Sequence, residues 1–459
     1  MPNNQLTNLR SSLSSNNLHT NLPTNLPKIC IIGTGYVGLV SGVCFASKGL
    51  SVICVDNNLD KVTNLQSGIC PIFEPKLEDL MKQSIASGNL TFETNTIEAA
   101  NNCDVVFLCL PTPAQEDGSA DLSYVLSVCN HIAPHLTNSK IIVNKSTVPV
   151  GTTQMVQEIF DELSTVSVVA ISNPEFLREG FAVDDFDNPD RVIIGTPNTN
   201  AKAVMSTIYS LFTTADKIVF MDTKSSEMTK YAANSFLATK ISFINEVANM
   251  CEQLGANVDN VALGMGLDPR IGNRFLKAGI GYGGSCFPKD VKALNSTSQQ
   301  MEYKFDILEA VMSINHKQKR IFVNKICSYY NRVDLSGLKI AVWGLSFKAD
   351  TDDIRDSASI EIIKLLLKKN ATIVCYDPES IDNFQRLHPE LLVECVRDKY
   401  EAVNKADGLI ILTEWQEFVD TDFVILAQRM NHKIIFDGRN IWATDYPTNK
   451  GFAYISVGR

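Results

Sequence analysis

The chain has 459 residues, 45% of them apolar, which is enough for about three folded units of ~150 residues each. Its 41 Lys and Arg against 51 Asp and Glu leave a net charge of −10, and no basic cluster offers a footprint for nucleic acid or anionic lipid. No run approaches the ~20 apolar residues of a membrane span, and no hydrophobic signal core begins the chain. These features predict a soluble, cytoplasmic protein that binds neither nucleic acid nor membrane.

The twelve cysteines and six histidines show no metal or disulfide pattern. No Cys-x-x-Cys occurs, and most cysteines lie in apolar runs such as 28–32, where a reduced core residue is the usual interpretation. The histidines fall outside every motif described below. We therefore expect no metal site and a reducing compartment.

Residues 1–27 are rich in Asn, Ser, Thr and Leu and contain three prolines and no acidic residue, a composition that predicts a disordered tail. From Lys28, short β-branched runs alternate with helical stretches, which is typical of a doubly wound α/β sheet. The predicted buried parallel strands are 28–32, 51–55, 104–110, 140–144, 167–171 and 191–194.

A long helix is predicted next. Asp222 and Thr223 can cap it, and 224–254 carries apolar residues at helical steps without Gly or Pro. At ~1.5 Å per residue this helix is about 45 Å long, more than one domain needs, so we expect it to bridge two lobes.

A second series of strands and helices begins at 337–344 and continues through 372–376, 408–413 and 433–436. The sequence thus predicts a first Rossmann-like lobe at 28–222 and a second at 331–459, joined by a helical connector and dimerisation domain at 223–330.

The first lobe contains a dinucleotide fingerprint. Gly33-Thr34-Gly35-Tyr36-Val37-Gly38 follows the first strand and opens a helix, and the next strand ends at Asp56. Such glycines let backbone N–H groups approach a pyrophosphate, and the acid binds the adenosine ribose hydroxyls. Asp56 favours NAD over NADP, although Lys61 softens that preference. A glycine turn in a cofactor-free α/β fold is the alternative.

Three further segments, 111–113, 145–147 and 173–179, each follow a predicted strand end. Because the ligand crevice of an open parallel sheet lies outside the carboxyl ends of its strands, we expect these loops to meet the glycine loop at one cleft. Each segment taken alone is equally compatible with a plain turn or cap.

The segment 270–290 contains five glycines between 272 and 284, which suit close approach of backbone to a ligand. Cys286 follows them, and Lys289 is a neighbouring cation that would favour its thiolate. Cys286 is therefore the candidate nucleophile, with a structural cysteine as the alternative.

Three other side chains have weaker local signals. Lys230 and Asn234 are four residues apart on the long helix and so share a face, although a helical Lys is usually a solvated charge. Lys348 lies in the loop 344–355 directly after a strand and could hold a nucleotide phosphate or form an ordinary turn. This loop lacks the dinucleotide glycine spacing, so the second lobe need not bind NAD.

Taken together, these motifs resemble the UDP-glucose 6-dehydrogenase family, part of the UDP-glucose/GDP-mannose dehydrogenases, from about Lys28 to at least Pro378. The signatures that carry the resemblance are 33–38, 146–149, 173–180, 230–234, 275–290, and Phe347-Lys348 with Arg355. It implies oxidation of C6 of UDP-glucose to a carboxylate, which consumes two NAD⁺ and one water and gives UDP-glucuronate. Cys286 would hold the intermediate as a thiohemiacetal and then as a thioester.

The resemblance also implies the other catalytic roles. Glu175 is similar to the general base that activates water for thioester hydrolysis, and Thr147 to a residue that helps orient it. Lys230 with Asn234 would stabilise the oxyanion at C6. Asp290 would position water or balance charge.

Ligand contacts follow from the same resemblance. The implied NAD contacts are Gly33, Gly35, Tyr36, Val37, Gly38, Asp56, Lys61, Thr112, Thr147, Glu179, Lys289 and Arg355. The implied substrate contacts are Glu175, Phe176, Leu177, Arg178, Glu179, Lys230, Asn234, Phe275, Leu276, Lys277, Ala278, Gly279, Gly283, Lys348 and Arg439, with Arg270 reaching a neighbouring subunit. A homodimer or higher homo-oligomer is therefore expected.

Three alternatives remain open at this point. Dehydrogenases acting on GDP-mannose or UDP-N-acetylmannosamine share the glycine loop, the lysine and the cysteine. A dehydrogenase that makes only one hydride transfer would give Cys286 no special role. A catalytically silent NAD-binding scaffold would need none of Cys286, Lys230, Glu175 and Asp290.

Overall fold

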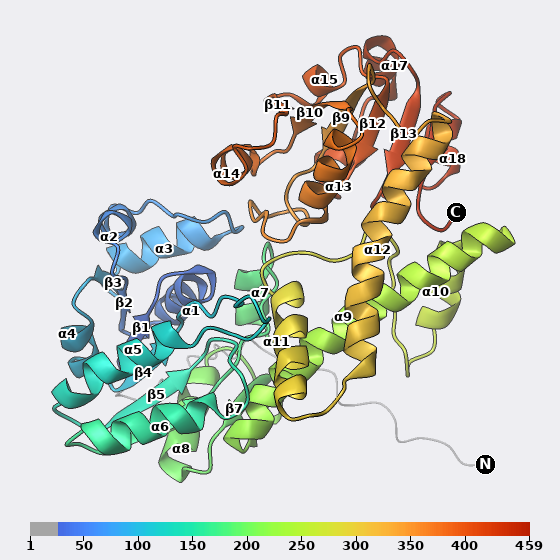
Figure 1. Ribbon diagram of the computed structural model, residues 1–459. Helices are drawn as coiled ribbons and strands as arrows, with labels where there is room; N and C mark the ends of the chain where they lie inside the picture. Colours follow the sequence, from blue (N-terminus) through green and yellow to red (C-terminus); the bar gives the residue numbers. More distant parts are fainter. Residues whose placement is uncertain (1–25) are drawn as a thin grey trace, which may run out of the picture.

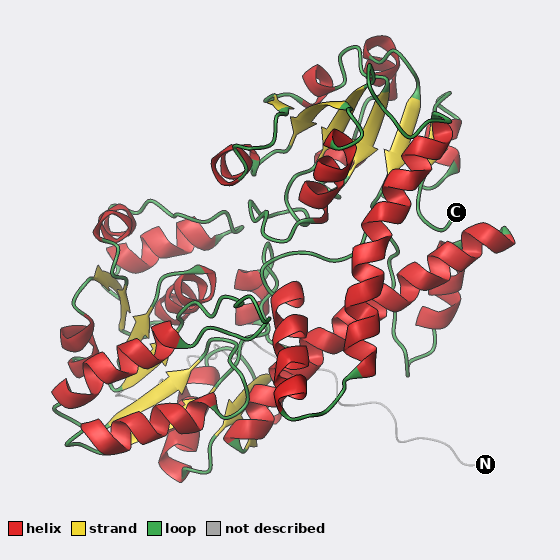
Figure 2. Ribbon diagram, viewed as in Figure 1, coloured by secondary structure: helices red, strands yellow, loops and turns green. Residues whose placement is uncertain are grey.

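The computed structural model describes residues 26–459. Residues 1–25 of the tail expected at 1–27 lie outside the described residues. Two α/β lobes are joined by a helical region from which α12 rises into the second lobe (Figure 1). Helices lie on both faces of the two sheets (Figure 2). The predicted fold class, two Rossmann-like lobes joined by a long helix, is confirmed.

The first sheet has eight strands in the order β3-β2-β1-β4-β5-β6-β7-β8. Its first six strands are parallel, and β1 is in register with β2 on one side and β4 on the other. The expectation that 191–194 runs parallel to the rest is wrong, because β7 meets β6 antiparallel at Ser172 and Gly195. The strands are β1 Ile29–Ile32, β2 Val52–Val55, β3 Leu90–Glu93, β4 Val105–Leu108, β5 Lys140–Asn144, β6 Val168–Ser172, β7 Val192–Gly195 and β8 Ile218–Met221.

Helices cover both faces of this sheet, which explains why its central strands are nearly continuous apolar runs. One core contains Ile29, Ile31 and Phe107, and the opposite core contains Cys30, Ile32 and Leu108. The helices are α1 Tyr36–Ser47, α2 Leu59–Gln66, α3 Leu77–Ala86, α4 Thr96–Asn101, α5 Ser123–Ile132, α6 Thr152–Leu163, α7 Ala182–Asp187 and α8 Thr199–Tyr209.

The connector is built on α9, Thr223–Leu254, which has 32 residues. Asp222 caps it by accepting from the Ser225 N–H, and Gly255 ends it at a φ of 72°, a left-handed conformation that glycine adopts without strain. α10 Val258–Gly266, α11 Phe287–Gln300 and α12 Asp306–Tyr329 pack against it. This long helix therefore contacts both the edge of the first lobe's sheet, at β6 and β7, and the helices of the connector.

The second sheet has the order β11-β10-β9-β12-β13-β14 and is parallel throughout. This order repeats that of the first six strands of the first sheet, so both lobes have the Rossmann topology. The strands are β9 Lys339–Trp343, β10 Thr372–Tyr376, β11 Glu394–Cys395, β12 Gly408–Ile411, β13 Ile434–Asp437 and β14 Ala453–Ile455. The helices are α13 Ala358–Leu367, α14 Ile381–Leu387, α15 Lys399–Ala402, α16 Gln416–Val419, α17 Phe423–Arg429 and α18 Asp445–Thr448.

Among the helices of residues 26–459, none combines the length and the apolar character that crossing a membrane requires. All twelve cysteines lie in this part of the chain, and each is a free thiol.

Candidate active site

The glycine loop between β1 and α1 has the shape that a dinucleotide needs. Gly33 has a φ of 96°, and a Cβ at Gly38 would lie 1.9 Å from the Gly33 carbonyl oxygen, so both positions require glycine. A Cβ at Gly35 would meet no atom within 4 Å, which leaves open space beside the backbone at the start of α1. The loop thus fits a pyrophosphate placed against the N-terminus of α1.

Asp56 directly follows β2 and lies beside this loop. Its Oδ2 accepts from the Thr34 N–H and hydroxyl and from Lys61 Nζ at 2.9 Å. Burial alone would raise the pKa of Asp56, but the bonds from Thr34 and Lys61 outweigh it and hold the pKa below its usual value. Oδ1 accepts only from Asn58 within the described chain, so it keeps acceptor capacity for a ribose hydroxyl.

A cavity of about 780 Å³ lies between the first lobe, α9 and the second lobe. Most of the predicted substrate and catalytic residues line it together: Glu175, Phe176, Leu177, Arg178, Glu179, Lys230, Asn234, Phe275, Gly283, Cys286 and Lys348. They come from the loop after β6, from one face of α9, from the glycine-rich segment before α11 and from the loop after β9. The parallel strands of both lobes therefore direct their carboxyl-end loops toward one space.

Lys230 and Glu175 form a buried ion pair, with 2.8 Å between Nζ and Oε1 and side chains only 4% and 5% exposed. Burial alone would lower the pKa of Lys230, and the Glu175 charge reverses this and raises it. Burial likewise would raise the pKa of Glu175, and the charge and hydrogen bond of Lys230 lower it instead. Both groups are therefore ionised at neutral pH, at the wall of the cavity.

One turn further along α9, Asn234 faces the same cavity. Its side-chain amide donates to Asp290 Oδ2 at 2.6 Å, and Lys289 Nζ donates to Asp290 Oδ1 at 2.8 Å. Asp290 is almost fully buried, on the first turn of α11. It therefore holds Asn234 in a fixed orientation, with the nitrogen of that amide committed to the carboxylate.

Cys286 sits at the N-cap position of α11 and lines the cavity. Burial raises the pKa of its thiol to about 11, the charge of Glu175 adds to this rise, and Lys230 opposes it. The expectation that Lys289 favours a thiolate is wrong, because the Lys289 ammonium pairs with Asp290 and the thiol is protonated at neutral pH. Lys230 is the nearby cation that acts on this sulfur.

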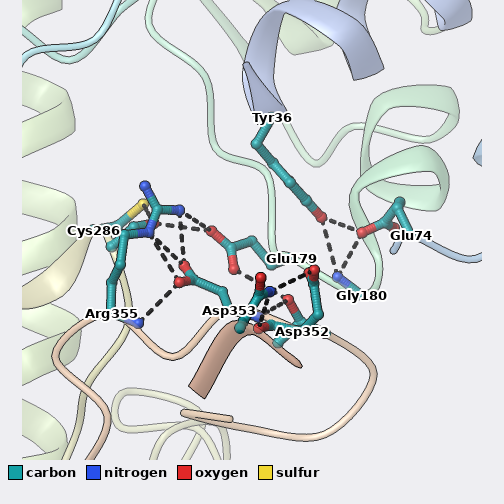
Figure 3. A network of polar contacts seen from close by, with 11 residues as sticks. Tyr36, Glu74, Glu179, Gly180, Cys286, Asp352, Asp353 and Arg355 are labelled. Carbon is teal, nitrogen blue, oxygen red and sulfur yellow. Dashed lines mark hydrogen bonds and ion pairs between the residues drawn. The ribbon is translucent and has the colours of Figure 1, made fainter. Parts of the chain in front are cut away.

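Glu179 links the two lobes beside this thiol (Figure 3). It accepts from the Ser285 hydroxyl at 2.9 Å, and the Arg355 guanidinium lies 3.8 Å from its carboxylate. Burial, with the negative charge of Asp353 next in weight, raises the pKa of Glu179 to about 7, while Arg355 opposes the rise. Glu179 is thus partly protonated at neutral pH.

The predicted NAD contacts Thr112, Thr147 and Lys289 also lie together. The Thr112 hydroxyl donates to the Thr147 carbonyl at 2.9 Å, and Lys289 Nζ lies 3.5 Å from the same hydroxyl. These contacts join the loops after β4 and β5 to α11.

Some predicted substrate residues do not line the cavity. Leu276 and Ala278 are buried in the core of the second lobe, Lys277 is exposed, and Gly279 packs against the Gly438 carbonyl. Their neighbour in space, Arg439, donates to the carbonyls of Leu412, Gly281 and Phe347, and so braces the loops around the cavity.

Arg270 also lies away from the cavity of its own subunit. It is 87% exposed and pairs with Asp268.

Two buried residues at the site escaped the sequence analysis as individual candidates. Lys145 lines the cavity, and its Nζ lies 3.3 Å from both the Asn173 side chain and the Tyr209 hydroxyl. Burial lowers the pKa of Lys145 to about 8. Glu74 accepts hydrogen bonds from the loop that follows Glu179. Lys145 could have been predicted from its position directly after a strand, whereas no local sequence feature indicates a role for Glu74.

Comparison with known proteins decides the family. Models of the UDP-glucose/GDP-mannose dehydrogenase family match its NAD-binding domain at residues 27–213, its central domain at 224–317 and its UDP-binding domain at 341–444. The chain belongs to this family. It is an NAD-dependent oxidoreductase, and the predicted resemblance and the predicted cofactor are both confirmed.

The relatives match nearly the whole chain. It is 46% identical over 437 residues to a UDP-glucose 6-dehydrogenase of Rhizobium meliloti, covering 94% of this chain and 99% of the relative. It is 42% identical over 436 residues to the UDP-glucose 6-dehydrogenase TuaD of Bacillus subtilis, covering 95% and 94%.

Solved structures show the same fold for this dehydrogenase. A UDP-glucose dehydrogenase of Pyrobaculum islandicum superposes with a TM-score of 0.87 at 34% identity, covering 94% of this chain and 97% of that one. The UDP-N-acetyl-mannosamine dehydrogenase Cap5O of Staphylococcus aureus has a TM-score of 0.77 at 26% identity, covering 94% and 98%.

Proposed function

We propose that this dehydrogenase oxidises C6 of UDP-glucose to the carboxylate of UDP-glucuronate in two steps, with Cys286 as the covalent nucleophile. The observation that carries the proposal is one cavity lined by a thiol, a buried Lys–Glu pair and a half-buried Lys from the second lobe. The relatives named as UDP-glucose 6-dehydrogenases support the substrate. Bound NAD supplies the hydride acceptor for both oxidations.

In the first oxidation the hydride of C6 passes to NAD and the proton of its hydroxyl passes to water, which gives an aldehyde. Lys230 is suited to stabilise negative charge on the oxygen at C6, because its ammonium is buried and therefore acts in a low-dielectric site. Asn234, held by Asp290, gives the substrate a fixed polar neighbour on the same face of α9.

Cys286 then adds to the aldehyde carbon. The sulfur–carbon bond forms while the thiol proton ends on the former aldehyde oxygen, so the product is a neutral thiohemiacetal. Burial raises the pKa of the resting thiol to about 11, so the attacking group starts as a protonated thiol. Lys230 again stabilises the oxygen during this step.

The thiohemiacetal loses the second hydride and its hydroxyl proton, and the product is a thioester on Cys286. Water attacks the thioester carbon, the sulfur leaves and regains a proton, and the carboxylate is released. Glu175 is proposed as the general base for this water, with Thr147 helping to orient it. The total is one water consumed and two hydrides transferred for each sugar nucleotide.

We propose that the second lobe holds the uridine diphosphate, with Lys348 on the phosphates. Lys348 is half-buried at the mouth of the cavity, and the matching family model describes a UDP-binding domain at 341–444. With a net charge of −10, attraction of an anionic substrate has to come from such local cations.

We also propose a homodimer formed through α9. Phe236, Phe243 and Met250 repeat every seven residues on this helix, and their side chains are 65%, 52% and 52% exposed. A stripe of this kind suits burial against a second copy of the same helix. Arg270, which is exposed and outside its own cavity, could then exchange its pairing with Asp268 for a contact in the cavity of the neighbouring subunit.

The test is a panel of sugar nucleotides assayed for NADH yield per substrate. We expect two NADH for each UDP-glucose, and little turnover with GDP-mannose or UDP-N-acetylmannosamine. One NADH per substrate would indicate a single hydride transfer, and no NADH with any substrate despite NAD binding would indicate a scaffold. Cys286→Ser should stall after the first oxidation, and full steady-state production of the acid by this variant would refute the covalent step.

A further inference from the structure

Glu74 is a buried carboxylate in the segment between α2 and α3. It is 6% exposed and does not line the cavity, and within residues 26–459 it forms no ion pair. Instead it accepts from the Tyr36 hydroxyl and from the Gly180 N–H at 2.6 Å (Figure 3), and also from the Ala182 N–H at 2.7 Å. Three such bonds are what a buried carboxylate without a cation needs to offset its desolvation.

These bonds fix the peptide that follows Glu179. Gly180 has a φ of 80°, and a Cβ there would lie 2.7 Å from the Asp350 carbonyl oxygen of the second lobe. The Gly180 backbone is therefore clamped between Glu74 on one side and the second lobe on the other. Its N–H belongs to the peptide bond formed by Glu179, so the direction of the Glu179 side chain depends on the Glu74 carboxylate.

From Glu179 the contacts continue to the thiol. The Glu179 carboxylate accepts from the Ser285 hydroxyl at 2.9 Å, and Ser285 Oγ lies 3.5 Å from Cys286 Sγ. Glu179 also lies within 3.5 Å of the Thr351 hydroxyl. Two contacts, Glu179 to Ser285 and Ser285 to Cys286, thus connect Cys286 to the residue that Glu74 positions.

The other end of this chain of contacts is the cofactor loop. Tyr36 is the first residue of α1 and directly follows Gly35, beside the open space at the helix N-terminus. Its hydroxyl donates to Glu74 and accepts from the Gly180 N–H, 144 residues further along the chain. These two bonds connect the start of α1 to the loop of Glu179.

We propose that Glu74 is a positioning residue of the active site, which couples the cofactor loop at Tyr36 to the placement of Glu179, and through Ser285 to the reactivity of Cys286. This inference rests on the proposed role of Cys286. Glu74 touches neither the cavity nor the sulfur, so it acts only through the residues that it holds.

The test compares Glu74→Gln and Tyr36→Phe with the wild-type enzyme. Gln has the shape of Glu, but its NH₂ group would face one of the two peptide N–H donors, so that N–H loses its bond to residue 74. Tyr36→Phe removes a single oxygen and leaves both peptide bonds to Glu74. Glu78→Gln, an exposed change four residues after Glu74 in the first turn of α3, is the matched control.

The first readout is the rate at which iodoacetamide alkylates Cys286, followed by peptide mass spectrometry on the full-length protein. Cys395 in the second lobe, which is partly exposed, is the internal reference. When Glu179 is released, its negative charge moves away from the sulfur and its side chain no longer shields the thiol. We therefore expect alkylation at pH 8 to be about threefold faster or more in both variants. The double variant should not exceed Glu74→Gln, because both changes break the same contact.

The second readout is steady-state kinetics. We expect kcat to fall about tenfold or more in Glu74→Gln with a smaller change in KM, as for a displaced reacting group, while Glu78→Gln is unaffected. Wild-type alkylation and wild-type kcat in Tyr36→Phe and Glu74→Gln would overturn the proposal, even if Tm falls. If Glu74→Gln does not fold, Tyr36→Phe decides alone. Production of the acid by Cys286→Ser would refute the proposed covalent role of Cys286. The alkylation rates would still test whether Glu74 positions the residues around that thiol.

Discussion

Replacing Lys145 with methionine should stabilise the first lobe at neutral pH while it impairs the site. The ammonium of Lys145 is buried, and none of the described carboxylates forms an ion pair with it. Its neighbours are the Asn173 carbonyl at 3.5 Å, and the Asn173 side chain and the Tyr209 hydroxyl, each at 3.3 Å. These are long hydrogen bonds to neutral groups, so they offset little of the cost of burying a charge.

The pKa of Lys145 gives the size of that cost. Burial lowers it from 10.5 to about 8, which corresponds to about 3 kcal/mol at ~1.4 kcal/mol per tenfold change in proton binding. Methionine avoids this cost but forfeits the three long bonds, worth about 1–2 kcal/mol together. We therefore expect Lys145→Met to raise the free energy of unfolding by about 1–2 kcal/mol at pH 7.

The pH dependence has a defined sign. Between pH 8 and 10.5 the unfolded chain keeps a proton on Lys145 that the folded chain has released, so the stability of the wild type rises with pH across this window. The advantage of Lys145→Met should therefore shrink from pH 8 upward and vanish by about pH 10.

Thermal unfolding measures this difference. For a lobe of about 200 residues, each kcal/mol shifts Tm by roughly 2–4 °C, so Lys145→Met should melt a few degrees higher at pH 7 and level with the wild type at pH 10. Lys217→Met, an exposed change in the same lobe, should show no such trend. A lower Tm at pH 7, or a difference that does not depend on pH, would refute the reasoning. Activity should fall in the same variant, because Lys145 holds the peptide that leads to Glu175.

Three further predictions concern the ligands and the assembly. Lys348→Ala should weaken UDP binding about tenfold and NAD binding less than about twofold by calorimetry, and equal losses would contradict its assignment to the phosphates. Phe243→Asp, in the exposed stripe of α9, should convert the proposed dimer to a monomer by light scattering, and an unchanged dimer mass would place the interface elsewhere. Asp56→Ala should weaken NAD binding about tenfold and leave UDP binding intact, whereas a loss of both would indicate a damaged lobe.

The sequence predicted the strands that are buried on both faces and missed those at the sheet edges. The six strands predicted in the first lobe all occur, because helices on both faces require continuous apolar runs. β3 and β8 were missed because each is partly exposed, so neither forms the continuous apolar run that marked the central strands. β11 and β14, of two and three residues, escaped for the same reason.

The same limit applies to the site. Cys286 was predicted from its glycine-rich surroundings, whereas Lys230 and Asn234, whose local signals are weak, were predicted from the family resemblance. Glu74 could not be found, because its partner Gly180 lies 106 residues away along the chain and only the folded backbone brings them together. The effect of Lys289 on Cys286 was also misjudged from proximity in sequence, because the helix directs the Lys289 ammonium to Asp290 instead.

The two lobes share one topology, and the acid after their second strand shows why they take different ligands. Asp56 and Asp377 occupy matching places, and Gly33 and Gly344 both have a φ near 100°. Asp377 is 1% exposed, and its two oxygens accept from the N–H groups of Leu345, Ser346, Glu379 and Ser380.

That carboxylate has no acceptor capacity left for a ribose and serves as a turn anchor. Asp56 keeps one oxygen with a single donor and a side chain that is 13% exposed, so a ribose hydroxyl can reach it. The two lobes thus differ in how many backbone N–H groups already bind the carboxylate after the second strand. Asp377 is fully engaged, whereas Asp56 can still accept a bond from a ligand. The second lobe instead offers Lys348, the proposed phosphate contact, in the cavity that it shares with the first.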